Sequence, residues 1–282
     1  MAVYLSRNAA CGTLDTLAQC TTDGSRGTVG NFVVPEGCHS IVEMHPSVGD
    51  GARVSTACGG TAVCVLKGPG LVHGEQTFAI AGCSSLDTGN TGKCYIYRPE
   101  VIPLDIAVTP GLEIECWVAQ SGVDWGTPEI AIGLVFVEAS AKAKMHYMTR
   151  NGPAGDSVNT ALAFGTLFLA TTPGAIQTAG FRSIKAIFGV GGNNTPVATA
   201  AGSCLQAVIG GTGLKGGEFV VQCSGEVLLS TTTGSSGDYI APGILLTDVE
   251  LQSGSLTMNG YQTGGVDVGK PEVAITLGLE EI

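Results

Sequence analysis

Two neighbouring segments alternate apolar residues with polar or small ones. Residues 104–108 read LDIAV and residues 112–116 read LEIEC, and the turn-forming sequence TPG lies between them. Alternation with a period of two is typical of a strand that buries one face, and Pro-Gly is typical of a turn. The pattern predicts two β-strands, at residues 104–108 and 112–119, joined by a turn.

Short apolar segments of the same kind occur throughout the first half of the chain. They predict further strands at residues 31–34, 40–44, 52–56, 62–67, 76–81, 94–98 and 128–138. Only residues 15–20 and 158–163 could form one or two helical turns, and no stretch of 12 or more residues has a helical period. Strands at this spacing predict a β-sandwich, a jelly roll or a barrel.

The last predicted strand and the turn before it return at the end of the chain. Residues 122–138 read GVDWGTPEIAIGLVFVE, and residues 265–281, 143 positions later, read GVDVGKPEVAITLGLEE. The same offset, without a gap, pairs residues of the amino-terminal segment with identical ones: Tyr4 with Tyr147, Arg7 with Arg150 and Asn8 with Asn151. A repeat of this length indicates two whole domains rather than a solenoid of short repeats.

We therefore predict an all-β chain of two tandem, similar β-sandwich or jelly-roll domains that arose by internal duplication. The first domain covers residues 1–140 and the second covers residues 144–282. The sequence ASAKAK at residues 139–144 is the most linker-like segment available between them.

Composition narrows the functional classes. Charged residues make up only 13% of the chain and hydrophobic residues 44%, which excludes an intrinsically disordered protein. The net charge is −11 and Lys and Arg are scattered, so no direct nucleic-acid binding is expected. The longest apolar run, residues 130–137, is too short to span a bilayer, and the first residues lack a secretion-signal pattern. We expect a soluble protein, made in the cytoplasm, with no transmembrane segment.

The ten cysteines do not form a recognisable metal or disulfide motif. Eight lie in the first copy, and none has a cysteine 143 positions later: Cys11, Cys20, Cys38, Cys58, Cys64, Cys83, Cys94 and Cys116. There is no CxxC, and the spacing from Cys58 to Cys64 matches no zinc ribbon. We expect mainly free, buried thiols acting as small hydrophobes, with disulfides and a metal site as the alternatives.

Histidines and paired acids give no clear catalytic pattern. On a strand, Cys38 and His39 would point to opposite faces, so a nucleophile–base pair is not expected there. The pairs Asp124 with Glu129 and Asp267 with Glu272 recur in both copies. They could form calcium or glycosidase sites, but a turn followed by a strand explains them better.

No phosphate-binding loop, nucleophile elbow or HExxH motif is present in the sequence. We therefore expect no catalytic residue, no cofactor and no metal, and a chain that is not an enzyme. Trp117 and Trp125 are the candidate ligand-binding residues, as exposed aromatic platforms. At an offset of 143 they face Gly260 and Val268, so such a site would not be duplicated.

The tandem architecture resembles that of viral structural proteins built of duplicated β-sandwich or jelly-roll domains. These include double-jelly-roll capsid subunits, capsid decoration proteins and duplicated tail proteins of phages. The segments VPEGCHSIVE (residues 34–43) and VTPGLEIECWVAQSG (residues 108–122) are similar to Gly-rich phage appendage domains.

The resemblance implies a virion structural protein, either a major capsid, a capsid decoration or a tail subunit, made in the host cytoplasm and located in the virion. Three copies would present six similar domains, so it implies self-assembly as a trimer with pseudo-hexagonal symmetry or as a larger assembly, in contact with neighbouring virion proteins. Two alternatives stay open: a two-domain carbohydrate-binding adhesin or lectin, and an enzyme on a jelly-roll fold.

Overall fold

The computed structural model of the protein is almost entirely β-structure. It describes residues 1–11, 14–49, 59–85, 94–97, 101–122, 127–153, 162–163, 165–166, 169–192, 204–230, 235–239, 244–263 and 272–282. One short 3-10 helix, η1 (Gly24–Arg26), accompanies the strands. The predicted all-β class is confirmed. Among the described residues, none of the helical structure is long and apolar enough to cross a membrane.

Residues 2–137 form two antiparallel sheets. The first has the order β1-β10-β4-β8, with bounds Ala2–Ala10, Glu129–Val137, Ser40–Gly49 and Ile102–Ala107. The second has the order β2-β9-β5-β6-β7, with bounds Ala18–Gln19, Glu113–Gly122, Gly59–Lys67, Gln76–Ser85 and Cys94–Tyr97. The short β3 (Phe32–Val33) also pairs with β9.

Residues 145–281 repeat this arrangement. One sheet has the order β11-β22-β16-β20, with bounds Met145–Pro153, Glu272–Glu281, Phe181–Gly192 and Leu245–Glu250. The other has the order β12-β21-β17-β18-β19, with bounds Leu162–Ala163, Ser255–Thr263, Cys204–Gly210, Phe219–Ser230 and Ser235–Tyr239. β15 (Ile176–Gln177) pairs with β21, while β13 (Gly165–Thr166) and β14 (Leu169–Pro173) form a separate two-stranded ribbon.

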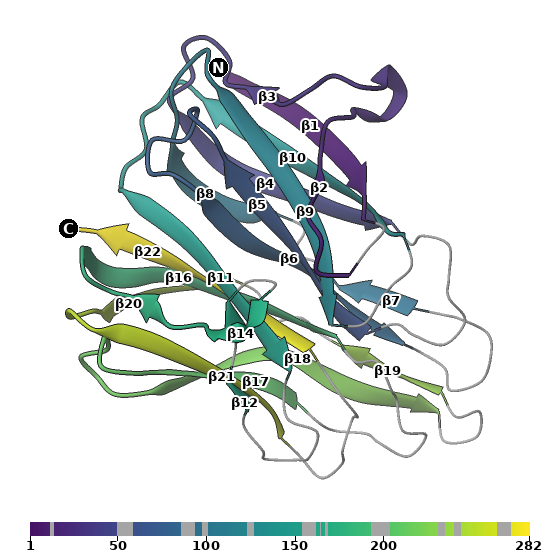
Figure 1. The fold of residues 1–282 in the computed structure, drawn as a ribbon, viewed down its shortest axis with the longest axis vertical. Helices are drawn as coiled ribbons and strands as arrows, with labels where there is room; N and C mark the ends of the chain where they lie inside the picture. The colour runs from purple at the N-terminus through teal and green to yellow at the C-terminus, as the bar shows by residue number, and fades with distance from the viewer. Residues whose placement is uncertain are drawn as a thin grey trace.

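In each half the two sheets face each other as a sandwich, and neighbouring strands come from distant parts of the sequence, as in a jelly roll. The first sandwich buries a core that includes Phe32, Phe78 and Phe136. The core of the second includes Ile184, Leu205, Leu256, Ile275 and Leu277. Figure 1 shows the first half, coloured purple to teal, lying above the second half, coloured teal to yellow.

Strand pairings repeat from one half to the other. β1 pairs with β10 from Ala2 opposite Val137 onward, and β11 pairs with β22 from Met145 opposite Glu280 onward, an offset of 143. The predicted constant offset is nevertheless wrong for some strands. Val118 of β9 lies opposite Cys64 of β5, whereas Ala207, 143 positions after Cys64, lies opposite Gly260 of β21, so β9 and β21 differ by 142. Because Ala18 pairs with Val118 and Leu162 pairs with Gly260, β2 and β12 differ by 144. One cause is the connection before β9, residues 108–112, which is one residue longer than its counterpart at 251–254.

The sequence pattern found most of the long strands but not all of them. It missed β1, and the helical turn predicted at residues 15–20 is wrong, because Ala18 and Gln19 pair with Val118 and Trp117 of β9. Residues 162–163 of the second predicted helical segment likewise form a strand, β12. The strand predicted at residues 52–56 lies outside the described residues.

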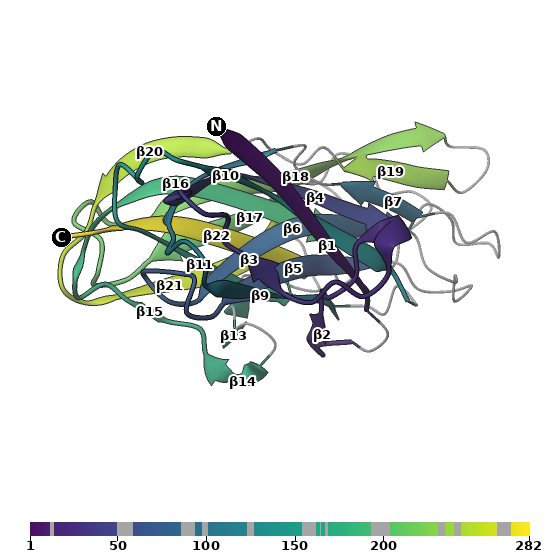
Figure 2. The same ribbon diagram turned by 90° about the horizontal axis from the view of Figure 1, so that it is seen from above.

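The equivalent strands β10 and β22 differ in burial, and the difference shows how the sandwiches are arranged. β10 has one exposed residue, Glu129, and several partly exposed ones, whereas β22 is buried at every residue from Glu272 to Glu280. One face of β22 packs into its own core, and the other packs against β5 and β6 of the first half. The four sheets are therefore stacked in one row, and β11, β16 and β22 lie against the first sandwich (Figure 1). Seen from above, the strands of the two sandwiches overlap (Figure 2).

Candidate functional site

A cluster of small and medium-sized apolar side chains lies at the junction between the two sandwiches. Val63, Ala79 and Ala119 of the first sandwich pack against Val190 and Ala274 of the second, and all five are fully buried. Small residues let two sheets approach more closely than large ones would. The junction is therefore a tight contact between sheets rather than an open cleft.

Side chains also satisfy backbone N–H groups across the junction. The Ala79 N–H lies beside a β-bulge, where the register shifts, and it donates to Thr276 Oγ1 over 2.8 Å. β11 is an edge strand, and its N–H groups at Tyr147 and Thr149 donate to Gln76 Oε1 (2.7 Å) and Thr77 Oγ1 (2.6 Å). Buried backbone donors need such partners, so these contacts fix how the sandwiches sit on each other.

Replacing Thr276 by valine is expected to destabilise the fold by about 1–3 kcal/mol, because the buried Ala79 N–H loses its acceptor. Thr149 Oγ1, which lies 2.8 Å from Thr276 Oγ1, loses a partner as well. The measurement is urea unfolding. Thr61→Val is the matched control: the Thr61 hydroxyl is buried without a hydrogen-bond partner among the described residues, so its removal should be neutral or stabilising. Equal losses in the two variants would contradict the assignment.

A buried carboxylate lies at the same junction. Glu272 accepts a hydrogen bond of 2.9 Å from Asn151 Nδ2, which also donates to Ser121 Oγ of the first sandwich. Burial raises the pKa of Glu272 to about 7, and the charge of Asp15 acts in the same direction. The equivalent pair in the first half, Asn8 and Glu129, lies at the exposed outer face. The same two residues thus have different environments in the two sandwiches.

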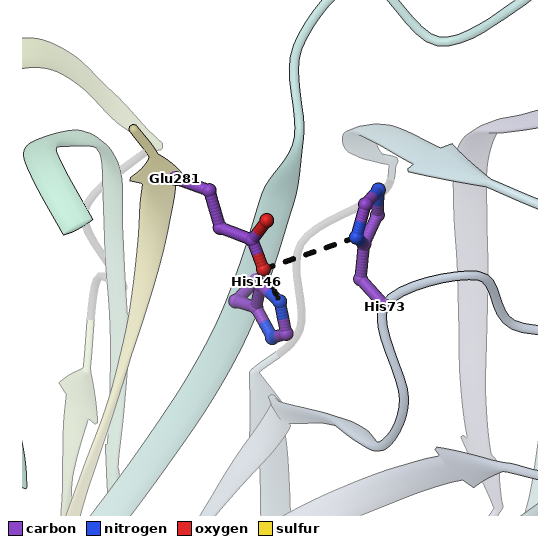
Figure 3. Close-up of side chains that lie close together, drawn as sticks. All are labelled: His73, His146 and Glu281. Atoms are coloured by element: carbon purple, nitrogen blue, oxygen red, sulfur yellow. Dashed lines mark hydrogen bonds and ion pairs between the residues drawn. The ribbon is translucent and has the colours of Figure 1, made fainter. Parts of the chain in front are cut away.

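At the rim of the junction, two imidazoles and a carboxylate converge. His146 Nε2 lies 2.5 Å from Glu281 Oε1, and His73 Nδ1 lies 3.8 Å from the same oxygen. The potential ligand atoms of the three residues all lie within 4.8 Å of one another. Figure 3 shows both histidines directed toward the carboxylate. All three side chains are partly buried, at 14%, 15% and 30% exposure, so the cluster remains open to solvent on one side.

Backbone pairing holds these three residues in place. His73 lies in the connection between β5 and β6, which is anchored by the Val72 N–H donating to the Ala107 carbonyl. His146 is within β11, and Glu281 ends β22, where its N–H donates to the Lys144 carbonyl. The ring of Phe181 packs edge-on against His146. One member therefore comes from the first half and two from the second.

Sequence reasoning missed this cluster. Nothing in the local sequence joins His73, His146 and Glu281, because they meet only when the sandwiches stack. The single available signal was the comparison of the two halves: at an offset of 143, His73 faces Gly216 and His146 faces Val3. Neither of these two imidazoles therefore has a counterpart in the other half.

The predicted ligand-binding residues stay a prediction. The indole N–H of Trp117 donates to Glu115 Oε2 over 2.8 Å, and Lys67 Nζ lies 4.6 Å from the ring centroid. The side chain is half-buried on β9, and its structural counterpart is Asn259 rather than Gly260, because Trp117 lies opposite Val65 and Asn259 lies opposite Val208. Trp125 lies outside the described residues, as do Asp124 and Asp267 of the acidic pairs.

The cysteines of the described core are buried free thiols: Cys11, Cys20, Cys38, Cys64, Cys116 and Cys223. Burial raises the pKa of Cys11 to about 12 and raises that of Cys223 further. Thiols in such surroundings are poor nucleophiles. Cys38 is buried while His39 is exposed, so the prediction that these two side chains diverge is confirmed.

A hollow of about 620 Å³ lies at one end of the second sandwich, and ion pairs line it. Lys185 Nζ lies 2.7 Å from Asp248 Oδ1, Lys215 Nζ lies 2.9 Å from Glu250 Oε2, and Arg182 pairs with Glu280. The paired cations hold the pKa of Glu280 at about 2. Because its cations are already paired with acids, this hollow is a weaker candidate for a site than the histidine cluster.

No protein-family model and no curated protein sequence matches the chain. Three solved structures illustrate what its fold is similar to. PNGase F, a glycosylasparaginase from Flavobacterium meningosepticum, is 12% identical with a TM-score of 0.42, covering 100% of this chain and 96% of that one. The major capsid protein P2 from bacteriophage PM2 is 10% identical with a TM-score of 0.32, covering 100% and 97%. The infectious bursal disease virus VP2 subviral particle is 9% identical with a TM-score of 0.24, covering 99% and 72%.

These comparisons correct one expectation. The prediction that the chain is not an enzyme is contradicted, because two of the solved structures that are similar to it in fold are those of an enzyme, PNGase F. Viral capsid proteins are also among the similar structures, at lower similarity. All of these TM-scores lie below 0.5, so the likeness concerns the arrangement of strands and gives no argument about the activity of this chain.

Proposed function

We propose that the protein is a virion structural subunit whose copies associate with one another, as a trimer with pseudo-hexagonal symmetry, and with neighbouring virion proteins. We also propose that residues 1–140 and 144–282 are two domains that arose by duplication. Three such chains would present six similar sandwiches around one axis. The repeated strand registers support the duplication. The main support for association between copies is an apolar edge strand of the second sandwich.

That edge strand is β20. It lies at the end of the order β11-β22-β16-β20, and no other described strand pairs with its outer side. Leu245 is 53% exposed and Leu246 is 72% exposed. At the equivalent position of the first sandwich, Ile102 of β8 is fully buried. A sheet edge that exposes large apolar side chains is a template for association with another chain.

An apolar hollow adjoins these leucines. It has a volume of about 390 Å³ and is lined mainly by apolar residues, among them Ile187, Val220, Val221, Ile244 and Leu245. Val220 is itself 50% exposed. The hollow and the edge strand form one surface, and a second copy of this chain is the partner that we assign to it.

The outer sheet faces at the two ends of the stack are poorer candidates for association. Val63 and Ala79 of the first sandwich pack in the junction. The equivalent residues of the second sandwich are Gln206 and Gln222, which lie opposite each other on β17 and β18. Gln222 is exposed and Gln206 is half-buried. Polar residues at these positions are suited to contact with water, so association is expected through the edges of the sheets rather than by extending the stack.

We expect the full chain to form a trimer or a larger assembly in light scattering and negative-stain microscopy. Replacing both Leu245 and Leu246 by lysine should weaken association by at least tenfold, about 1.4 kcal/mol, because the apolar contact is lost and like charges are brought together. The readout is the molar mass measured over a range of protein concentrations.

Val33→Lys is the control for this pair. Val33 is an apolar residue of similar exposure, 48%, but it lies on β3 of the first sandwich. It should leave the molar mass unchanged. A wild-type chain that stays monomeric at high concentration would refute the proposed function, and an assembly that tolerates the two lysines would refute the role of β20.

A further inference from the structure

We propose that His73, His146 and Glu281 bind one zinc ion, which ties the two sandwiches together at the rim of their junction. Nothing in the assembly proposal requires this site, and the site does not depend on that proposal. Its basis is the convergence of three metal-binding side chains from three segments that are far apart in the sequence.

The donor set favours zinc over magnesium and calcium. Two imidazoles and one carboxylate match zinc, whereas magnesium and calcium take oxygen ligands almost exclusively. Three protein ligands leave the fourth tetrahedral position for water or for a group supplied by another molecule. The cluster is only partly buried, so this fourth position faces the solvent.

The distances are compatible with zinc after small side-chain movements. In a tetrahedral site with metal–ligand bonds of about 2.1 Å, the ligand atoms lie about 3.4 Å apart. Here the carboxylate oxygen lies 2.5 Å from one imidazole nitrogen and 3.8 Å from the other. The required spacing lies between these two values, so side-chain rotations can reach it without a change in strand pairing.

The backbone is already arranged for binding. His146 and Glu281 lie on the paired strands β11 and β22, and the register of this pair fixes the backbone positions of both residues. The His73 turn is tied to residue 107 by a backbone hydrogen bond of 3.1 Å. Because these elements are positioned before binding, little conformational entropy would be lost when the ion binds. The ion would join one ligand of the first sandwich to two of the second.

The test uses the full-length chain, freed of metal with a chelator and then dialysed, and titrated calorimetrically with zinc chloride. We expect one zinc ion per chain, which millimolar magnesium or calcium does not displace. His73→Ala, His146→Ala and Glu281→Gln should each weaken binding by more than about tenfold, since even the loss of a residue that only supports a zinc ligand has an effect of this size. At a zinc concentration a hundred times the dissociation constant, the melting temperature should rise by about 5 °C or more.

His45→Ala is the matched control, since its imidazole also lies beside a glutamate, Glu43, but away from the junction. It should leave zinc binding unchanged. His73 is on a surface turn, so His73→Ala should melt in chelator at the wild-type temperature and separates loss of ligand from loss of fold. If the wild type binds no zinc, or if the three variants bind it as the wild type does, the proposal is overturned.

Cobalt substitution decides whether the ion is held by histidine or by cysteine. The proposed site should give the spectrum of tetrahedral cobalt with nitrogen and oxygen ligands, and His73→Ala should abolish it. An intense thiolate-to-metal band that persists in this variant would place the ion on cysteines and would also overturn the proposal. The molar mass measured in parallel, with and without chelator, reports separately on the assembly proposal.

Discussion

Replacing Gly82 by alanine is expected to lower the stability of the fold by about 3 kcal/mol, because the added methyl group has no room at the junction. Gly82 lies on β6 and faces the backbone of Gly191 on β16. A Cβ atom at residue 82 would lie 2.1 Å from the Gly191 carbonyl oxygen. The contact is with backbone, so no side-chain rotation can relieve it, and the two sheets would have to move apart.

Separation of the sheets would affect the whole junction. The small apolar side chains of Val63, Ala79 and Ala119 contact the second sandwich only at close range. A shift would also stretch the hydrogen bond from the Ala79 N–H to Thr276. We therefore expect the melting temperature to fall by about 5–10 °C.

Gly216→Ala is the matched control. A Cβ atom at residue 216 would meet nothing within 4 Å, so this variant should melt at the wild-type temperature or slightly above it. Differential scanning calorimetry of both variants provides the measurement. If Gly82→Ala melted within 1 °C of the wild type, the two sheets could not be packed as closely as the structure has them.

Replacing Glu272 by glutamine is expected to stabilise the protein by about 3 kcal/mol at pH 8 and to have little effect at pH 5. The pKa of Glu272 is raised from 4.5 to about 7 by burial, with Asp15 adding to the shift. The folded state therefore keeps its proton where the unfolded chain has lost it. The contribution of Glu272 to stability is complete below pH 4.5 and is lost as the pH rises toward 7. Above pH 7 the carboxylate is charged in both states, and the charge is buried in the folded state alone.

The measurement is urea unfolding of the wild type and the variant at several values between pH 5 and pH 8. The difference between the two proteins isolates Glu272 from the other titrating groups. Glu129→Gln is the matched control at the equivalent, exposed position of the first half, and its effect should be much the smaller. A difference between wild type and Glu272→Gln that does not change with pH would show that the carboxyl is not buried as described.

The strands were predictable from the sequence where one face meets water. The alternation LDIAV at residues 104–108 matches β8, in which Leu104 and Ile106 are buried while Asp105 and Ala107 are partly exposed. β22 was found as the copy of β10, but its burial on both faces was not foreseen. Its own sequence lacks clear alternation because the first sandwich covers the face that β10 leaves open to solvent.

The way the sandwiches stack was harder to predict than the sandwiches themselves. Periodicity shows that a strand has a buried face, but it does not show which sheet covers the other one. One comparison of the two halves could have indicated which face is covered. At an offset of 143, the apolar residues Val63 and Ala79 correspond to the polar residues Gln206 and Gln222. The histidine cluster had no local signal, because its members are separated by most of the chain and meet only through the packing of whole domains.

The row of four sheets begins and ends differently. The face of β1, β10 and β4 closes one end, and the face of β21, β17 and β18 closes the other, so the molecule has a direction along the stack. In a trimer whose six sandwiches surround one axis, the three stacks would follow one another around that axis. The surface with Tyr4 and Glu129 of one copy would then be turned toward the surface with Gln206 and Gln222 of the next copy. The order of the sheets would thus give such a ring a sense of rotation.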